Sequence, residues 1–260
     1  MSLRIVVTVK YVPDATGDRH FADDLTVDRD DVDGLLSELD EYAVEQALQI
    51  ADDGDDVDVV VMTLGPDDAS DAIKRALQMG ASAGIHIIDD PVHGSDALAT
   101  SALLAEAIKK ATPDLVICGM ASTDGTMGVI PAMVAERLGW PAVTLGATLS
   151  VADGRVTIRR DDDVASSTIE AELPAIVSVT DQSGEARYPS MRGILAAKKK
   201  PVETWTLADL GIDGSAVGLD AAWSKVLQTS PRPAKEAGRV VEEENGTSAF
   251  IDFLTAGKYI

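Results

Sequence analysis

The sequence of 260 residues holds 44 acidic and 22 basic residues, a formal net charge of −22 at pH 7. Such a field repels nucleic acid and anionic membranes, and the basic patch that nucleic-acid-binding proteins use is missing. The longest apolar runs fall well short of the roughly 20 residues that cross a bilayer. Because the N-terminus also lacks a cleavable signal architecture, we expect a cytoplasmic protein that is not embedded in a membrane. Acidic residues spread along the whole chain, with few lysines, are typical of proteins from salt-loving cells.

The first two thirds of the chain alternate strand and helix patterns. Short β-branched apolar runs, typical of strands covered on both faces, occupy residues 3–12, 56–65, 84–89 and 114–120. Between them, helical repeats that open with Ser or Asp begin near Ser37, Asp67 and Gly94. This alternation predicts right-handed βαβ crossovers and a Rossmann-like α/β fold, a doubly wound, mostly parallel sheet with helices on both faces.

Residues 118–141 lead from the fourth strand through a turn rich in glycine and aspartate into a helix that we expect to begin near Met127. At a helix N-terminus, free backbone N–H groups point at phosphate oxygens, and small residues allow close approach. The anion cradle predicted here consists of Asp124, Gly125, Thr126 and Gly128. Because no GxxxxGKS/T or GxGxxG element is present, an ordinary strand-to-helix connector is the alternative interpretation.

Two further strand ends are expected at the same rim. Thr8 lies near the end of the first strand, and Leu64 with Gly65 ends the second. In a doubly wound sheet these residues and the loop at Asp124 surround one crevice, where such folds bind ligands. Simple core packing is the alternative for Thr8 and Leu64.

After Trp140 the pattern changes. Residues 141–151, 154–161 and 167–180 look like consecutive strands that extend or flank the sheet, with a hairpin turn at 152–154. From residue 206 the apolar periodicity thins, residues 229–247 resemble a linker, and the closing amphipathic segment places Phe250 and Phe253 on one docking face. We therefore predict an α/β nucleotide-binding domain at 1–205 and an extended arm at 206–260 that packs on a partner subunit.

No catalytic set or metal site emerges. The single cysteine, Cys118, excludes an intrachain disulfide, and its apolar setting predicts a buried structural thiol. The histidines His20, His86 and His93 lack zinc-site spacing, and His86 is expected to be a strand residue. Without a GxSxG elbow, the chain is expected to bind and position rather than to make bonds.

Seven motifs, in their order and near their spacing, resemble those of electron transfer flavoprotein beta subunits, over residues 3–201. The motifs are VVTVKYVPD from Val6, DEYAVEQAL from Asp40, TLGP from Thr63, ALQMGA from Ala76, DGTMGVIPAMVAERLGWP from Asp124, ELPAIVSV from Glu172 and ARYPSMRGILAAKKKP from Ala186. The resemblance implies a heterodimer with a larger alpha subunit, and a shared FAD held mainly by that subunit. The beta subunit would bury AMP or a second FAD and carry electrons between flavin dehydrogenases, such as acyl-CoA dehydrogenases, and a membrane quinone oxidoreductase or another carrier.

Carried over by position, the resemblance implies two sets of functional residues. The nucleotide-contacting set is Thr8, Ser37, Glu38, Leu39, Asp40, Leu64, Gly119, Asp124, Gly125, Thr126, Met127, Gly128, Val129 and Ile130. The partner-binding set is Arg187, Tyr188, Pro189, Met191, Ile194, Lys198, Lys199 and Lys200. Met191 stands where the family has an apolar residue that anchors in a pocket on partner dehydrogenases, and a flexible Met suits several partners. Without the resemblance, the lysines are expected to end a short helix over residues 191–200, where positive charges interact favourably with the C-terminal end of the helix dipole.

Departures from the family pattern concern the same regions. Met127 and Val129 replace hydroxyl and amide side chains of the nucleotide loop, and Ala15 and Leu39 stand where some members have aromatic residues near the flavin. A family Glu that orients the flavin domain aligns with Ser167. The alternative function is a stand-alone adenine nucleotide-binding protein of the universal-stress or ATP-pyrophosphatase type, although the SGGxDS-like loop of the latter is replaced here by KYVPDATGD.

Overall fold

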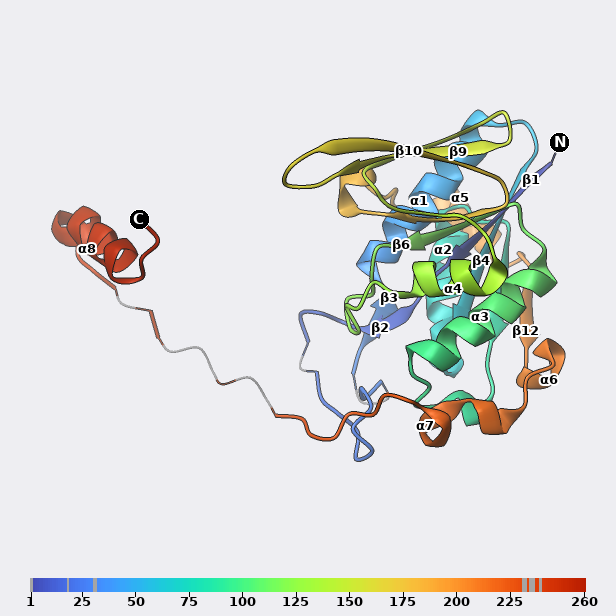
Figure 1. Cartoon of the computed structure of the whole chain (residues 1–260), viewed down its shortest axis with the longest axis horizontal. Helices are drawn as coiled ribbons and strands as arrows, with labels where there is room; N and C mark the ends of the chain where they lie inside the picture. Colours follow the sequence, from blue (N-terminus) through green and yellow to red (C-terminus); the bar gives the residue numbers. More distant parts are fainter. Residues whose placement is uncertain (1, 18, 30–31, 231–232, 234–236, 239) are drawn as a thin grey trace. The chain divides into compact units, whose positions relative to one another are not determined.

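A seven-stranded parallel sheet runs in the order β12-β5-β4-β1-β6-β11-β7 (Figure 1). This computed structural model describes residues 2–17, 19–29, 32–230, 233, 237–238 and 240–260. The strands of the sheet are β1 (Leu3–Thr8), β4 (Val57–Leu64), β5 (Ala83–Ile87), β6 (Leu115–Gly119), β7 (Ala142–Gly146), β11 (Ala175–Val179) and β12 (Val202–Trp205). The predicted doubly wound α/β fold is confirmed, since β4 and β5 extend the sheet on one side of β1 and β6 on the other.

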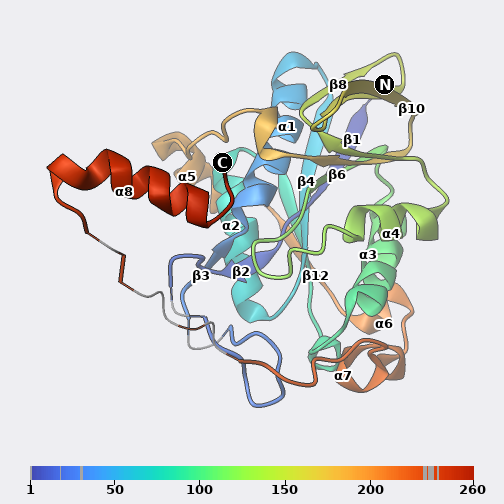
Figure 2. The ribbon, with the colours of Figure 1, turned by 60° about the vertical axis from the view of Figure 1, so that its left-hand side comes forward.

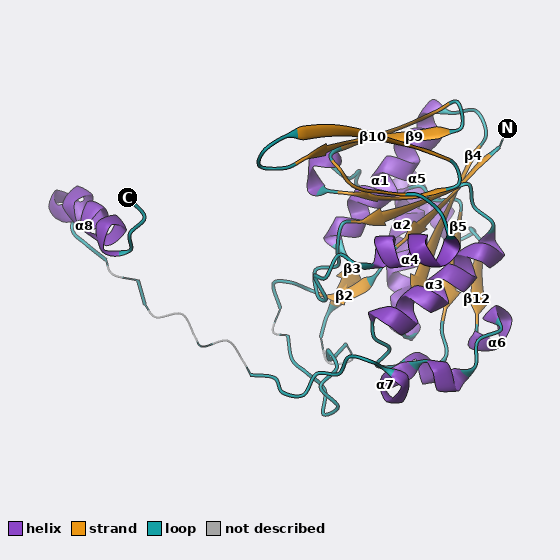
Figure 3. Cartoon of the chain, in the orientation of Figure 1, coloured by secondary structure: helices purple, strands orange, loops and turns teal. Residues whose placement is uncertain are grey.

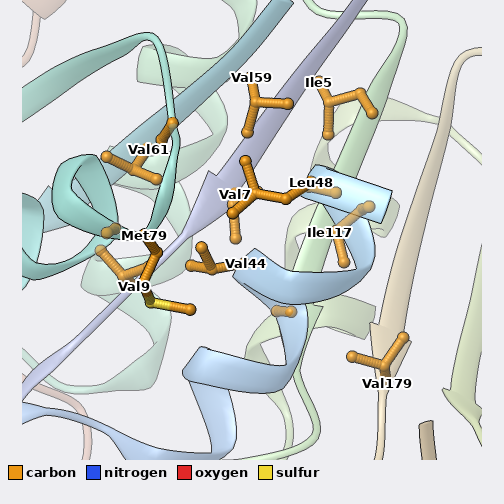
Figure 4. Close-up of a cluster of buried hydrophobic side chains, with 14 of the residues drawn as sticks. Ile5, Val7, Val9, Val44, Leu48, Val59, Val61, Met79, Ile117 and Val179 are labelled. Carbon is orange, nitrogen blue, oxygen red and sulfur yellow. The ribbon is translucent and has the colours of Figure 1, made fainter. Parts of the chain in front are cut away.

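Helices cover both faces of the sheet (Figure 3). They are α1 (Glu38–Asp53) and α2 (Ser70–Met79) on one face, α3 (Ala97–Ala111) and α4 (Ile130–Leu138) on the other. Alternate side chains of β1 point to opposite faces, so Val7 packs with the α1 side and Val6 with the α3 side. In Figure 4, Val44 and Leu48 of α1 lie over Val7 and Ile117. Burial on both faces explains why these strands are continuously apolar.

The segment after Trp140 both extends and flanks the sheet. β7 and β11 join the main sheet, whereas β8 (Thr148–Ala152), β9 (Arg155–Asp161) and β10 (Ser166–Glu172) form a separate antiparallel sheet (Figure 2). The predicted hairpin turn is confirmed: Asp153 and Gly154 have φ of 51° and 73°, as a two-residue turn between twisted strands requires.

The runs predicted as single strands at 141–151 and 167–180 are each two strands in different sheets. Two predicted boundaries near the candidate site are also wrong. The first strand ends at Thr8, and residues 11–13 form a separate strand, β2 (Tyr11–Pro13), paired with β3 (Gly34–Leu36). The helix expected near Met127 begins at Ile130, because Thr126 and Gly128 have positive φ, 53° and 63°, which a right-handed helix does not allow. Short 3-10 turns span Asp67–Ala69, Asp90–Val92, Asp181–Ser183 and Gly214–Ala216.

The chain divides into a unit Met1–Leu227 and a unit Gln228–Ile260. The first unit therefore extends past residue 205 and includes α5 (Met191–Ala197), α6 (Leu207–Leu210) and α7 (Gly218–Ala221). The second contains α8 (Glu243–Ala256), where Phe250 and Phe253 are exposed. Part of the linker predicted at 229–247 lies outside the described residues, and packing of the arm on a partner stays a prediction. Over the described ranges, no helix is long and apolar enough to cross a membrane.

Candidate functional site

A cavity of about 260 Å³ opens at the carboxyl ends of β1, β4 and β6. The winding of the sheet reverses between β1 and β6, and open α/β sheets bind ligands at such a switch point. Of the predicted nucleotide residues, those that line the cavity are Thr8, Asp40, Leu64, Gly119, Gly125, Met127, Gly128, Val129 and Ile130. The crevice expected from the strand ends is therefore present, and Thr8 and Leu64 face it.

The other predicted nucleotide residues do not line the cavity. They are Ser37, Glu38, Leu39, Asp124 and Thr126. Ser37 is buried at the start of α1, and its N–H donates to the carbonyl of Lys10. Residues that the sequence analysis missed include Lys10, at the end of β1, and Ser95, Asp96 and Thr100, around the start of α3. A strand pattern alone does not signal them, because they come from connections rather than from apolar periodicity.

The loop before α4 presents its backbone to the cavity. Thr126 donates its N–H to the carbonyl of Ser122 at 3.0 Å, and Gly125 donates to Asp124 Oδ1 at 2.6 Å. Among the described residues, none accepts a hydrogen bond from the N–H groups of 127–130. These groups precede and open α4, where the helix dipole favours an anion. The loop therefore offers several donors to one anionic ligand.

Asp124 holds this loop in place through ion pairs and is not among the residues that line the cavity. Its carboxylate is 3% exposed and pairs with Lys10 Nζ at 2.9 Å and Arg29 Nη2 at 2.5 Å. Burial alone would raise the pKa of Asp124, but Lys10, Arg29 and the Ser122 hydroxyl hold it well below its usual range. A charged anchor thus ties the loop to the end of β1 and to the segment after β2.

Asp40, in the first turn of α1, joins the ends of the two strands at the switch point. Its Oδ2 accepts the N–H of Lys10 at 2.8 Å, and the N–H of Gly119 also bonds the carboxylate. A Cβ on Gly119 would lie 2.4 Å from Asp40 Oδ1, so only glycine permits this approach. Burial raises the pKa of Asp40 to about 7, although the two N–H groups and Lys10 oppose the shift.

Cys118 and His86 lie where the sequence predicted. Cys118 is buried in β6, and burial raises the pKa of its thiol to about 12, so it is not a thiolate nucleophile at neutral pH. His86 is buried in β5, with Nε2 3.1 Å from the carbonyl oxygen of Gly65. In the part of the chain that the structure describes, no three His, Cys, Asp or Glu residues form a metal-binding group.

Two charged residues of the predicted partner-binding segment bind this chain's own helices. Arg187 Nε lies 2.7 Å from Glu45 Oε2, and its Nη2 lies 2.8 Å from Asp52 Oδ2, both on α1. Lys200 Nζ donates to the carbonyls of Leu77 and Gly80 at 2.8 and 3.1 Å, and so closes the end of α2 instead of α5. Both side chains thus have partners within this chain, and their role as partner contacts stays a prediction.

The exposed side chains of the segment include three large apolar ones. Tyr188, Met191 and Leu195 are 88%, 75% and 61% exposed, and the spacing of Met191 and Leu195 places them on one face of α5. Pro189 and Ile194 are half-buried, whereas Lys198 and Lys199 are exposed. The sequence analysis missed Leu195, although its position four residues after Met191 is a helical signal.

Fold and cavity define a doubly wound α/β protein with a cavity at its switch point. The family called electron transfer flavoprotein domain matches residues 24–210. "Electron transfer flavoprotein subunit beta" of Mycobacterium leprae is 46% identical over 98% of this chain and 99% of its own length, and that of Syntrophomonas wolfei is 36% identical over 94% and 92%. "Caffeyl-CoA reductase-Etf complex subunit CarD" of Acetobacterium woodii is 33% identical over 92% of each chain. The chain therefore belongs to the electron transfer flavoprotein family, as a beta subunit.

Proposed function

We propose that this chain pairs with an electron transfer flavoprotein alpha subunit in the cytoplasm and carries electrons through an FAD held mainly by that subunit. The donors are flavin dehydrogenases such as acyl-CoA dehydrogenases, and the acceptor is a membrane quinone oxidoreductase or another carrier. Membership of the family over nearly the whole chain supports the pairing. The shared FAD supplies the redox chemistry, and the residues of this chain bind and position.

The observation that carries the proposal is the cavity at the switch point. Its wall combines apolar strand ends with the N–H groups of 127–130, which suits an adenine nucleotide with its base inside and its phosphate on the loop. The volume of about 260 Å³ lies below the roughly 300–1,000 Å³ of typical ligand pockets. That size supports AMP over a second FAD, which is the larger ligand. The side chains of Met127 and Val129 cannot donate, so within this loop stretch the donors to the phosphate are backbone N–H groups.

Two exposed apolar surfaces support the partner roles. Tyr188, Met191 and Leu195 form the surface that we assign to dehydrogenases. Phe250 and Phe253 of α8 form the surface that we assign to the alpha subunit, as part of the arm predicted from residue 206. Contiguous exposed apolar side chains mark protein–protein interaction sites, whereas single ones are normal on any surface.

Coexpression with the alpha subunit tests the pairing and the cofactors together. A yellow 1:1 complex that releases one FAD and one AMP on acid extraction is the expected result. Two FAD per complex would contradict the assignment of AMP, and failure of the two chains to co-purify over a range of salt concentrations would contradict the pairing.

The substitution Met191→Ala tests the dehydrogenase surface. Reduction of the complex by a partner dehydrogenase is expected to slow roughly tenfold, because truncating a central apolar anchor costs about 1–2 kcal/mol of binding. The complex and its cofactor content should stay intact. Val164→Ala, at another strongly exposed apolar residue, is the matched control and should leave the rate unchanged.

A further inference from the structure

Basic side chains converge on the loop at 122–129, in a chain whose net charge is −22. Lys10 lines the cavity, and its Nζ lies 3.8 Å from the position of a Cβ on Gly125. Arg29 Nη2 pairs with Asp124 Oδ2, the carboxylate oxygen that Lys10 does not contact. Arg19 Nη1 donates to the carbonyl of Thr123 at 3.0 Å. An acidic protein that binds a nucleotide must overcome its own field at the phosphate, and this cluster lies where that is needed.

The cluster has more positive than negative charge. Asp124 is a single carboxylate shared by Lys10 and Arg29, so one of the two cations is left unneutralised. Arg29 is held on both sides, since its Nη1 donates to the carbonyl of Tyr11 at 3.0 Å. The Lys10 side chain is more exposed than that of Arg29, and one of its N–H groups donates to Asp124. The other ammonium N–H groups can turn toward the cavity. The surplus charge therefore resides on Lys10.

The other carboxylate near Lys10, Asp40, cancels only part of this charge. Asp40 is tied to the backbone N–H groups of Lys10 and Gly119, and its burial disfavours the ionised form. The free N–H groups of 127–130 lie on the same loop as Gly125, against which the ammonium rests. A phosphate on that loop would meet backbone donors and one mobile cation.

Resting on the nucleotide site proposed above, we propose that Lys10 is the charged ligand of the nucleotide phosphate and that Arg29 is a positioning residue that keeps Asp124 from neutralising it. The ammonium keeps its contact with Asp124 and adds a charge-assisted hydrogen bond to a phosphate oxygen. Lys10→Met should leave the loop in place, because Arg29 remains on Asp124.

Calorimetric titration of the nucleotide-stripped heterodimer with AMP and with adenosine tests the assignment. Lys10→Met is expected to weaken AMP binding roughly 10- to 100-fold, the usual range for a lost hydrogen bond to a charged group, and to leave adenosine affinity unchanged. Lys10→Arg should restore most of the AMP affinity. Arg29→Met should weaken AMP more than adenosine, because Lys10 then pairs fully with Asp124. Lys74→Met, at an exposed lysine of α2, is the control.

Three results would overturn the assignment. Equal losses for AMP and adenosine in Lys10→Met would make the residue structural, and unchanged affinities would remove it from the site. A wild-type heterodimer that binds neither ligand would refute the nucleotide site itself, and with it this inference. AMP that co-purifies with each complex, counted against its FAD, gives a second readout: Lys10→Met should lose AMP while FAD stays complete.

Discussion

Replacing Asp40 with asparagine removes the buried carboxyl that joins the ends of β1 and β6 while nearly keeping its shape. In the native protein burial raises the pKa of Asp40 from 3.8 to about 7, and the N–H groups of Lys10 and Gly119 only partly oppose the shift. The amide of an asparagine side chain does not titrate in this range. The wild type and Asp40→Asn should therefore differ in how their unfolding free energy depends on pH, and not only in the magnitude of that free energy.

The sign follows from proton binding. Because the folded pKa lies above the unfolded one, the native state holds the Asp40 proton more tightly than the unfolded chain does. The resulting stabilisation is complete below about pH 4 and is lost as the pH rises through about 7. The shift corresponds to on the order of 4 kcal/mol of unfolding free energy. Relative to Asp40→Asn, the unfolding free energy of the wild type should fall by that amount, on the order of 4 kcal/mol, as the pH rises from about 4 through about 7.

Urea denaturation of both proteins between about pH 4 and about pH 8.5 measures the difference in unfolding free energy. At the acid end the wild type should be the more stable, and the difference should shrink or reverse toward alkaline pH. Asp14→Asn is the control, because hydrogen bonds from Thr16 lower the pKa of Asp14. Its contribution to stability is lost only below about pH 4, so the difference between wild type and Asp14→Asn should stay constant across this range. A difference between wild type and Asp40→Asn that stays constant with pH would refute the argument from burial.

Two further pairs of substitutions, each a test and its control, separate structural charges from partner contacts in the segment at 186–201. Arg187→Met should lower the unfolding free energy by about 3 kcal/mol, because it leaves the nearly buried Glu45 without its cation, whereas Arg192→Met should change it by less than about 0.5 kcal/mol. If both variants unfold at the same urea concentration, the ion pair of Arg187 with Glu45 does not stabilise the fold. Lys200→Met should cost about 1–2 kcal/mol by releasing the end of α2, while Lys199→Met should not, as thermal melts of the pair would detect.

Much of the fold could be predicted because strands covered on both faces must be continuously apolar. The runs at 56–65, 84–89 and 114–120 lie within a residue or two of β4, β5 and β6. The break after Thr8 could not be seen, because Val9 and Tyr11 keep the run apolar while the chain leaves the sheet. The start of α4 was missed for a backbone reason, the positive φ at Thr126 and Gly128.

The candidate site was harder to predict, since its contacts join distant segments. Thr8, Leu64 and the loop at 125–130 could be placed together, because topology alone brings the carboxyl ends of parallel strands to one edge. The role of Asp124 depends on Arg29, which is 95 residues away in sequence, and no local pattern signals such a pair. The partner of a charged side chain depends on how the helices and the sheet pack. Its role is therefore the feature that is hardest to predict from the sequence.

In the basic segment at 186–201, the charges bound within the chain decide which side chains remain for binding a partner protein. Arg187 and Lys200 are bound to α1 and α2. The segment therefore offers partners the apolar Tyr188, Met191 and Leu195 beside the exposed charges of Arg192, Lys198 and Lys199. Salt at about 1 M shortens the screening length to roughly 3 Å, which weakens exposed ion pairs but not apolar contacts. A docking surface built from apolar side chains thus keeps its strength at ionic strengths that a chain of net charge −22 tolerates. We therefore expect the effect of Met191→Ala on reduction by a dehydrogenase to persist as salt is raised, whereas Lys198→Ala should matter only at low salt.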